Sequence, residues 1–555
     1  MGRALRKTGG RTAVWLRLLA WAWLTALLSV AQSAQPSAQV EPATAVSARI
    51  AQILADSPAT LRGIPILAAA ARQAYEPRGY RPLWQGGPEA RERARLLQAA
   101  LDDAAAHGVD TGDLRLPAAA DPADTYGAAE VDILITDAFL RYAGRIHPGV
   151  DRETRRYWAI VPDPIDPAAE LATAGDPAAF ASLLRALLPS APAYDRLVDA
   201  LRRYRGIAAA GGWPAVPDDG EVVLGGDDPR LATLRRRLTI EGDLAAGAAD
   251  DDGDALVAAV RRFQARHGLD PDGRVGVRTL TELNVTAERR VVQILANLER
   301  WRMLPRRMPQ TRVVVNVADA TLEYLRDGVP SLGMRVVVGD RRHATPVLAA
   351  AITAVVLNPP WNVPRSIATR EILPKLKRDP GYLARNGIVV VGREDGDPHG
   401  QRIDWLKLSA DRFPFRLRQL PGPGNALGRI KFDLPNPFDV YLHDTPSKAA
   451  FKRPDRGLSH GCVRLERPEE LAERLLDGAA WDADALAAAI ATGETRRVAL
   501  QRPVPVYLLY WTAFVDAAGL VEFRRDLYGR DRQGEVDPGR LQPIAGASPT
   551  GGCPG

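Results

Sequence analysis

Cysteine is scarce in this chain of 555 residues, which contains only Cys462 and Cys553. Two thiols are too few for a disulfide-stabilised scaffold, so that class of protein is excluded. Paired metal-binding spacings are missing as well, because no Cys-x-x-Cys or His-Glu-x-x-His pattern occurs. Cys462 therefore has to be explained by its own neighbours, and a disulfide with Cys553 would silence it as a nucleophile.

A concentrated basic region is also missing. The chain has 73 basic and 67 acidic residues, which gives a formal net charge of +6. This small excess does not indicate nucleic-acid binding, which needs a clustered basic face. It favours only a general attraction to anionic polymers or membranes.

The apolar run near the N-terminus is short. Leu18 to Val30 follows four basic residues within the first eleven positions, and small residues stand at positions 29, 31 and 33. The run is too short to cross a bilayer comfortably, and the whole pattern is typical of a secretory signal. We predict a signal peptide at residues 1–31, with an uncleaved anchor as the alternative. The mature protein would then lie outside the cytoplasm, where a free thiol is rarely kept without a use.

Residues 40–226 are rich in alanine, leucine and arginine and are predicted to form a helical scaffold domain. Apolar residues recur at helical spacing in 91–106 and in 131–146. The region contains no catalytic constellation, and its histidines His107 and His147 stand alone.

Residues 227–285 are predicted to be a small three-helix unit. The string from Phe263 to Gly273 is followed by Val275-Gly276 and Thr279-Leu280. This order resembles that of the peptidoglycan-binding module, and the resemblance implies a glycan as a partner. An acidic insert, Glu241 to Asp254, departs from the module's pattern. Whether this copy binds glycan or only helps to assemble the chain stays open.

A connecting helix is predicted within residues 286–311, and short β-branched runs separated by turn residues follow it. Strands are expected at 312–317, 321–325, 334–338, 354–357, 440–443 and 504–510. Such repetition indicates a β-sandwich or a barrel-like core over residues 312–531. The predicted class is a multidomain α+β protein whose last domain is mainly β, followed by a disordered tail at 532–555.

Cys462 lies in the string Ser459-His460-Gly461-Cys462-Val463-Arg464-Leu465. Three interpretations compete for it. It is a small buried apolar residue, a zinc ligand together with His443 and His460, or a nucleophile with a histidine base. Burial alone does not explain the polar neighbours, and no paired spacing supports a metal, so the nucleophile is favoured.

The string Tyr441-Leu442-His443-Asp444-Thr445-Pro446, followed by Ser459-His460-Gly461-Cys462, resembles the signature of the L,D-transpeptidases, the cysteine enzymes that remodel bacterial peptidoglycan. The order of the parts is similar to that of the large periplasmic members. The resemblance implies a periplasmic location and no cofactor. It also implies that residues 364–413 form a lid over the site, with a surface insertion as the alternative.

The resemblance further implies the roles of individual residues. His443 would take the thiol proton of Cys462, held in place by the backbone carbonyl of Asp444. His460 would support the site, although strand alternation also allows it to approach the thiol. Ser459 and Gly461 are expected in the supporting or oxyanion set. Four residues are expected to contact substrate: Tyr441, Arg464, Trp361 and Asn425.

The activity that the resemblance implies is transfer of a tetrapeptide stem. Cys462 would attack the carbonyl of the third residue, release D-alanine and pass the acyl group to a neighbouring stem. Three alternatives remain: an L,D-carboxypeptidase, a lipoprotein-anchoring transferase and a wall-binding scaffold without catalysis. The expected partners are peptidoglycan stem peptides and glycan, with other cell-wall synthesis proteins possible and no nucleic acid.

Overall fold

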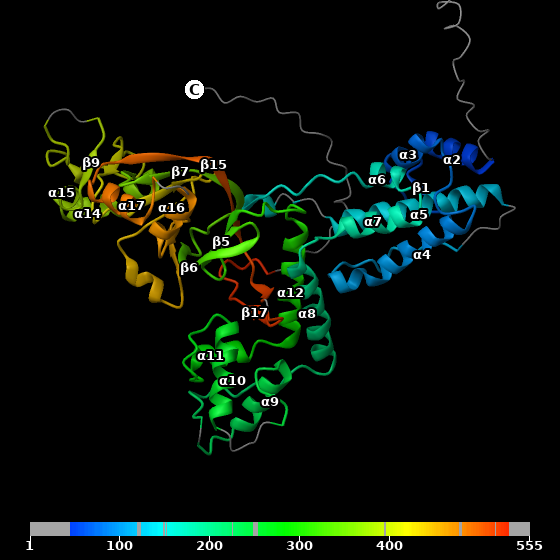
Figure 1. Ribbon diagram of the computed structural model, residues 1–555, viewed down its shortest axis with the longest axis horizontal. Helices are drawn as coiled ribbons and strands as arrows, with labels where there is room; N and C mark the ends of the chain where they lie inside the picture. The colour runs from blue at the N-terminus through cyan, green and yellow to red at the C-terminus, as the bar shows by residue number, and fades with distance from the viewer. Residues whose placement is uncertain are drawn as a thin grey trace, which may run out of the picture. The chain divides into compact units, whose positions relative to one another are not determined.

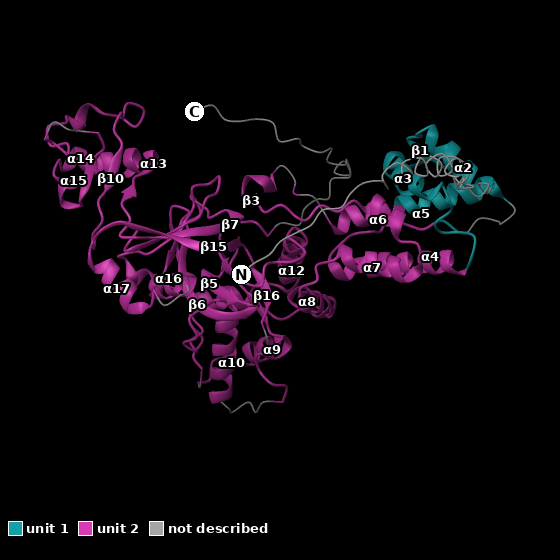
Figure 2. Ribbon diagram, turned by 45° about the horizontal axis from the view of Figure 1, so that its top comes forward, with its two compact units in different colours: residues 1–87, 117–137 teal, residues 88–116, 138–555 magenta. Residues whose placement is uncertain are grey.

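The computed structural model describes residues 45–118, 124–147, 150, 153–224, 226–247, 253–392, 396–476, 480–516 and 518–531 (Figure 1). The predicted signal peptide, the predicted tail and Cys553 lie outside these residues. The chain divides into two compact units, residues 1–87 with 117–137 and residues 88–116 with 138–555 (Figure 2). Within the described residues, no helix is both long and apolar enough to span a membrane.

The first unit is helical. Its elements are α2 (Ala45–Ala55), β1 (Thr60–Leu61), β2 (Ile64–Pro65), α3 (Ala68–Tyr75), η1 (Glu76–Arg78) and the beginning of α5 (Thr125–Ile146). The buried carboxylate of Asp132 accepts hydrogen bonds from the Tyr75 hydroxyl and from the amides of Leu83 and Trp84. These bonds fix the loop after α3 to α5.

The second unit begins with further helices. They are α4 (Pro88–Asp103), η2 (Ala104–His107), η3 (Thr154–Arg156), α6 (Pro167–Thr173), α7 (Pro177–Leu187) and α8 (Pro192–Ala209), with the short strand β3 (Trp158–Ala159) between η3 and α6. The helices predicted at 91–106 and 131–146 are confirmed as α4 and α5. Asp166 and Asp176 cap α6 and α7, each accepting from backbone amides in the first turn.

The predicted three-helix unit and the connecting helix are also confirmed. They are α9 (Leu231–Glu241), α10 (Gly253–Arg266), α11 (Val277–Leu283) and α12 (Ala287–Arg302). The three helices enclose a core around Phe263, Leu238 and Leu280. Helix α12 packs along α8, and both cover the hairpin β16 (Ala513–Val515) and β17 (Val521–Phe523).

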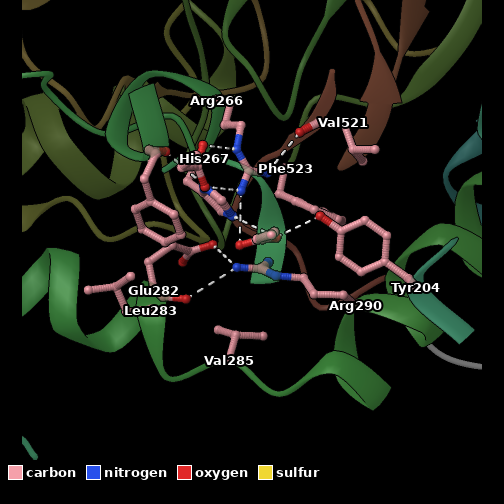
Figure 3. A network of polar contacts seen from close by, with 12 residues as sticks. Tyr204, Arg266, His267, Glu282, Leu283, Val285, Arg290, Val521 and Phe523 are labelled. Carbon is pink, nitrogen blue, oxygen red and sulfur yellow. Dashed lines mark hydrogen bonds and ion pairs between the residues drawn. The ribbon is translucent and has the colours of Figure 1, made fainter. Parts of the chain in front are cut away.

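A buried network of charges joins this unit to its surroundings (Figure 3). Glu241 binds Arg237 at 2.5 Å, Arg266 at 2.9 Å and the Tyr204 hydroxyl at 2.6 Å. Arg266 also pairs with Asp243 at 2.5 Å and donates to the Val521 carbonyl at 3.1 Å. The acidic insert that starts at Glu241 therefore begins inside the protein core. The sequence pattern did not predict this buried position.

Burial opposes ionisation of Glu241, but the charges of Arg266 and Arg237 outweigh it and hold the pKa of this carboxyl well below its usual range. Burial lowers the pKa of the neighbouring His267 well below its usual value, so this ring stays neutral. Nearby, Arg290 pairs with Glu282 at 2.5 Å. Three guanidinium groups thus meet three carboxylates within the described network.

The strands between residues 312 and 509 form a sheet that closes on itself. In spatial order the ring is β11 (Ile430–Asp433), β12 (Leu442–His443), β14 (Val463–Leu465), β6 (Val329–Gly339), β5 (Thr321–Arg326), β4 (Arg312–Asn316), β15 (Arg496–Leu509) and β7 (Val347–Leu357). Pairing of β7 with β11 closes it. The expected barrel-like core is therefore confirmed, and its interior is filled by apolar side chains such as Val313, Leu442 and Val463.

The predicted strands at 354–357 and 504–510 are only the second halves of longer strands. The first half of β7 carries three alanines at 349–351, and the first half of β15 carries arginines and Pro503. Neither stretch has a strong intrinsic β preference. Strands β7 and β15 are antiparallel, so each of these stretches pairs with the predicted half of the other strand. This pairing, from Arg496↔Leu357 to Leu508↔Leu348, imposes the strand structure.

The insertion predicted at 364–413 has a core of its own. It contains α13 (Arg365–Ile367), η4 (Ala368–Ile372), α14 (Leu373–Arg378), α15 (Tyr382–Arg385), β9 (Ile388–Val390) and η5 (Trp405–Lys407). Strand β9 pairs with β10 (Leu417–Gln419), which pairs with β8 (Trp361–Asn362). Leu376, Leu383 and Phe413 are among its buried side chains. This segment is a small folded subdomain, called the insertion subdomain below.

The remaining elements complete the second unit. They are η6 (Lys448–Lys452), β13 (Gly457–Ser459), α16 (Pro468–Leu476) and α17 (Ala483–Ala491). Strand β13 pairs with β6 and leads directly into the loop that carries Cys462.

Candidate active site

Two neighbouring parallel strands place the predicted nucleophile and base on one face. The register of β12 and β14 pairs Leu442 with Val463 and His443 with Arg464. Leu442 and Val463 point into the barrel core, so by alternation His443 and Arg464 lie on its outer face. Cys462, just before β14, is then the diagonal neighbour of His443 on this face.

The loop around Cys462 is held by hydrogen bonds. The Ser459 hydroxyl donates to the Cys462 carbonyl at 2.5 Å and accepts from the Gly461 amide at 3.1 Å. The Thr345 hydroxyl donates to the Gly461 carbonyl at 2.8 Å. Because Ser459 occupies the Gly461 amide, that group is not available as an oxyanion donor. The Cys462 amide, for which the described residues supply no acceptor, is the remaining candidate of the pair.

His443 is buried, and its tautomer is fixed. Its Nδ1 lies 2.5 Å from the Asp444 carbonyl, which can only accept, so Nδ1 carries the proton and donates it. Burial and then the charge of Arg464 lower the pKa of His443 to about 4, against the pull of the Asp444 carbonyl. The ring is therefore neutral near pH 7, and its Nε2 is free of a proton. This is the form that a general base requires.

Cys462 is held as a thiol in the resting site. Burial raises its pKa, while hydrogen bonds from Tyr441 and the charges of Lys431 and Arg464 oppose that rise. The Sγ atom lies 3.9 Å from the Asp439 carbonyl. Burial, and then the charge of Cys462, raises the pKa of Tyr441, so its hydroxyl keeps its proton and can donate. The groups around Sγ thus favour a thiolate once it forms.

Arg464 is a half-buried cation without a carboxylate partner among the described residues. Burial lowers its pKa, and Cys462 opposes that change. Its Nε atom is buried and has no hydrogen-bond partner. An unpaired buried charge is costly unless a ligand supplies the counter-charge. Lys431, opposite His443 on β11, stacks over the Tyr441 ring at 4.7 Å and pairs with Asp433 at 3.2 Å.

His460 does not share the face of Cys462. Strand β13 ends at Ser459, and Gly461 adopts φ 108°, a left-handed conformation that breaks the alternation on which the expectation rested. The His460 Nε2 instead lies 2.7 Å from Glu371 of the insertion subdomain, and its ring is 4.4 Å from that of His343. The zinc set of His443, His460 and Cys462 is therefore not assembled. The described residues contain no group of three or more ligands that could hold a metal.

The other predicted site residues divide into two groups. Trp361 forms a hydrogen bond that opposes the rise in the pKa of Tyr441, so it lies beside the hydroxyl that borders the thiol. The Asp444 carboxylate accepts from the Arg429 amide at 2.8 Å and pairs with Lys448 at 2.7 Å, which ties down the loop. Asn425 is 1% exposed.

The Asn425 side chain donates to the Leu420 carbonyl at 2.9 Å and accepts from the Leu427 amide at 2.8 Å. The expectation that Asn425 contacts substrate is therefore wrong, because its own loop uses these groups.

Three residues near the site were not assigned a role from the sequence. Thr345 supports the loop, Lys431 flanks the base, and Glu371 holds His460. Lys431 and Thr345 lie within strings that resemble the family, but no spacing links them to Cys462. Only the strand pairings bring these residues together.

Comparisons with known proteins agree with this organisation. Residues 310–498 match the family model of the L,D-transpeptidase catalytic domain, YkuD. Residues 69–201 match a scaffold domain, and residues 227–283 match a model named "Putative peptidoglycan binding domain". A Haemophilus influenzae protein named "Putative L,D-transpeptidase" is 36% identical over 247 residues, covering 44% of this chain. The match spans half the length of that relative.

Solved structures were compared as well. L,D-transpeptidase 3 from Mycobacterium tuberculosis is 13% identical, with 37% of this chain and 62% of that chain covered and a TM-score of 0.18. An L,D-transpeptidase from Xylanimonas cellulosilytica is 16% identical, with 53% and 98% covered and a TM-score of 0.18. The family matches show similarity to the L,D-transpeptidase catalytic domain over residues 310–498, preceded by segments that are similar to a scaffold domain and to a peptidoglycan-binding domain.

Proposed function

We propose that this protein is a peptidoglycan L,D-transpeptidase with Cys462 as its nucleophile and His443 as its general base. The observation that carries the proposal is the neutral, tautomer-fixed His443 on the same outer face as a thiol that is bordered by Tyr441, Lys431 and Arg464. Supporting it are the family match over residues 310–498 and the relative from Haemophilus influenzae.

The first half of the reaction acylates the enzyme. The thiol of Cys462 turns from the Asp439 carbonyl toward His443, whose Nε2 takes its proton. The sulfur then attacks the carbonyl carbon of the third residue of a tetrapeptide stem, forming a C–S bond and an oxyanion that the Cys462 amide faces. When the oxyanion collapses, the C–N bond breaks, and protonated His443 gives its proton to the leaving amine of D-alanine.

The second half transfers the acyl group. The side-chain amine of a neighbouring stem loses a proton to His443 as it attacks the thioester. The C–S bond breaks, the Cys462 sulfur regains a proton, and an amide links the two third residues. If water replaces the amine, the product is that of a carboxypeptidase. If a protein lysine replaces it, the enzyme is a lipoprotein-anchoring transferase.

The substrate's carboxylates suit the charge of the site. A stem peptide ends in the carboxylate of D-alanine, and Arg464 supplies a guanidinium that lacks a counter-ion among the described residues. A guanidinium binds a carboxylate through two parallel hydrogen bonds. We assign Arg464 this role, with Tyr441 and Trp361 bordering the peptide.

The proposed location is the periplasm, reached by means of the predicted signal peptide at residues 1–31. The proposed partners are peptidoglycan stem peptides and glycan, with other cell-wall synthesis proteins as further candidates. The domain at residues 227–283 supports the wall as the place of action.

Incubation with diaminopimelate-containing tetrapeptide muropeptides, followed by mass spectrometry, tests the proposal. We expect a cross-linked dimer with one D-alanine lost, and no product from Cys462→Ala. Loss of D-alanine without a dimer identifies the carboxypeptidase, and attachment to an added lipoprotein identifies the anchoring enzyme. No change in any substrate identifies a scaffold, and a dimer made by Cys462→Ala refutes the nucleophile.

A further inference from the structure

A second cavity lies in the second unit, away from Cys462. Its volume is about 400 Å³, which suits a small organic ligand. Its walls come from the α7–α8 connection, from the end of α12 with the segment after it, and from the β4–β5 hairpin with Trp511. None of the residues proposed for the transpeptidase reaction lines it.

Two indole rings form part of this cavity. Trp301 and Trp511 stack with ring centroids 4.8 Å apart and planes 18° apart. Both side chains are partly exposed. The described residues provide no hydrogen-bond acceptor for either indole N–H. A partly exposed aromatic surface with free N–H groups is suited to a ligand that has both apolar faces and oxygen acceptors.

Arginine side chains give the cavity its charge. Neither Arg306 nor Arg307 has an ion pair or a side-chain hydrogen bond within the described structure, and the Arg306 Nε is buried. Arg312 donates to the Pro309 carbonyl at 2.7 Å and has no carboxylate within ion-pair distance among the described residues. Among the lining residues, Glu323 is the only acid. The cavity is therefore strongly cationic.

The backbone that carries these arginines is held in place. The Asp163 carboxylate accepts from the Arg306 amide at 2.9 Å, and the Ser190 hydroxyl donates to the Arg306 carbonyl at 3.1 Å. His147 lines the same cavity, and burial lowers its pKa, with Arg306 adding to the effect. The arginines are thus positioned by neighbours that do not neutralise them, which reduces the ordering cost of binding.

We propose that this cavity binds a saccharide of about two rings that carries a carboxylate. The sugar rings would lie against Trp301 and Trp511, where their oxygens accept from the indole N–H groups. The carboxylate would bind Arg306 and Arg307, since a guanidinium and a carboxylate form paired charge-assisted hydrogen bonds. Leu304, Leu325 and Met308 supply the apolar wall. The site gives the chain a hold, separate from its reaction site, on glycan whose muramic carboxylate carries no stem peptide.

Binding is measured by isothermal titration calorimetry on the full Cys462→Ala chain, so that catalysis plays no part. The probe is the disaccharide of N-acetylglucosamine and N-acetylmuramic acid with its free carboxylate, a choice that rests on the proposed function. The matched neutral probe is di-N-acetylchitobiose, and inorganic phosphate tests for a bare anion site. We expect the acidic disaccharide to bind about tenfold more tightly than the neutral one.

Substitutions locate the site. Arg307→Gln, at an exposed position, should weaken binding of the acidic disaccharide about tenfold, and Arg306→Gln by a similar factor. Arg502→Gln removes an exposed arginine outside the cavity and should have no effect. Thermal melting of each variant separates loss of binding from loss of folding.

The proposal is overturned by absence of binding up to about 10 mM, by equal affinity for both disaccharides, or by phosphate alone binding as tightly. Affinity that survives both arginine substitutions also overturns it. Because the assay contains no reaction, each of these results leaves the transpeptidase proposal standing. Conversely, an inactive enzyme that still binds the acidic disaccharide refutes only the proposed reaction.

Discussion

Two clusters in this chain bury charged groups, and they differ in how the charge is balanced. Around Glu241, three carboxylates meet three guanidinium groups between the three-helix unit and its neighbours. Around Cys462, Arg464 is half-buried and meets no acid among the described residues, and His443 is neutral. A balanced cluster supports the fold, whereas an unbalanced cluster has charge left for a ligand.

The largest expected effect is on catalysis. His443→Gln removes the base while keeping a polar side chain of similar size, so we expect transpeptidation to fall roughly 10²–10⁴-fold. Product formation from tetrapeptide muropeptides measures it. The substitution leaves the Glu241 cluster intact, so the melting temperature should change little. A variant with at least a tenth of the wild-type rate would remove His443 from the mechanism.

The opposite outcome is expected in the balanced cluster. Glu241→Gln leaves Arg237 without its buried counter-charge and Arg266 with Asp243 alone, which costs about 3–5 kcal/mol of unfolding free energy. Denaturant unfolding measures this loss. Glu221→Gln is the matched control, because Glu221 pairs with Arg274 at 2.8 Å on the surface of the same unit. Equal losses of unfolding free energy for the two variants would contradict the conclusion that burial makes the charge of Glu241 important for stability.

Substitution of Arg464 tests the difference between the Glu241 cluster and the Cys462 cluster most directly. Arg464→Gln should lower kcat/KM about 10–100-fold by removing the proposed carboxylate contact. Stability should be unchanged or higher, since an unpaired half-buried cation is removed. Steady-state kinetics and thermal melting test both parts. The control is Arg467→Gln, whose side chain pairs with Glu470 at 2.9 Å. If Arg464→Gln lowers stability but leaves kcat/KM unchanged, Arg464 has a structural role and not a substrate-binding role.

The pH dependence follows from His443. Its pKa in the folded chain is about 4, below the ordinary 6.5, so the acid limb of kcat/KM should lie near pH 4. Folded His443 binds fewer protons than unfolded His443 between these values, so its contribution to stability falls as the pH drops from about 6.5 to about 4. An acid limb near pH 6.5, measured by initial rates, would contradict the buried neutral ring.

The smallest effect is expected where the insertion subdomain meets the Cys462 loop. Glu371→Gln removes the ion pair with His460, in which both side chains are more than one-third exposed. Such a pair contributes little, so the rate of alkylation of Cys462 should change roughly fivefold or less. Asp404→Asn is the control, because it breaks a pair with Lys407 inside the subdomain.

Sequence reasoning succeeded where local pattern decides the structure. Short β-branched runs predicted β4, β5 and the second half of β6, and apolar spacing predicted α9 to α12. The strings around His443 and Cys462 gave the two residues that the parallel β12–β14 pair brings to one face. The helical N-terminal region followed by a β-rich L,D-transpeptidase domain is confirmed.

Sequence reasoning failed where the folded structure, and not the local pattern, decides what a side chain contacts. Asn425 was expected at the substrate, but its side chain is used within its own loop. Strand alternation allowed His460 to approach the thiol, but the positive φ of Gly461 breaks the alternation and His460 pairs with Glu371. The acidic insert from Glu241 was predicted only as a departure from the module's pattern, because nothing in the local sequence shows the arginines that meet Glu241 and Asp243.

Because β7 pairs with β11, the sheet closes into a barrel. Strands β12 and β14 therefore have no free edge from which to fray, and their amides should be among the last to exchange with deuterium. The insertion subdomain lies outside this barrel and is tied to the Cys462 loop by the exposed pair between Glu371 and His460. A change in this pair can therefore alter the surroundings of Cys462 while the strand pairing that holds His443 stays intact.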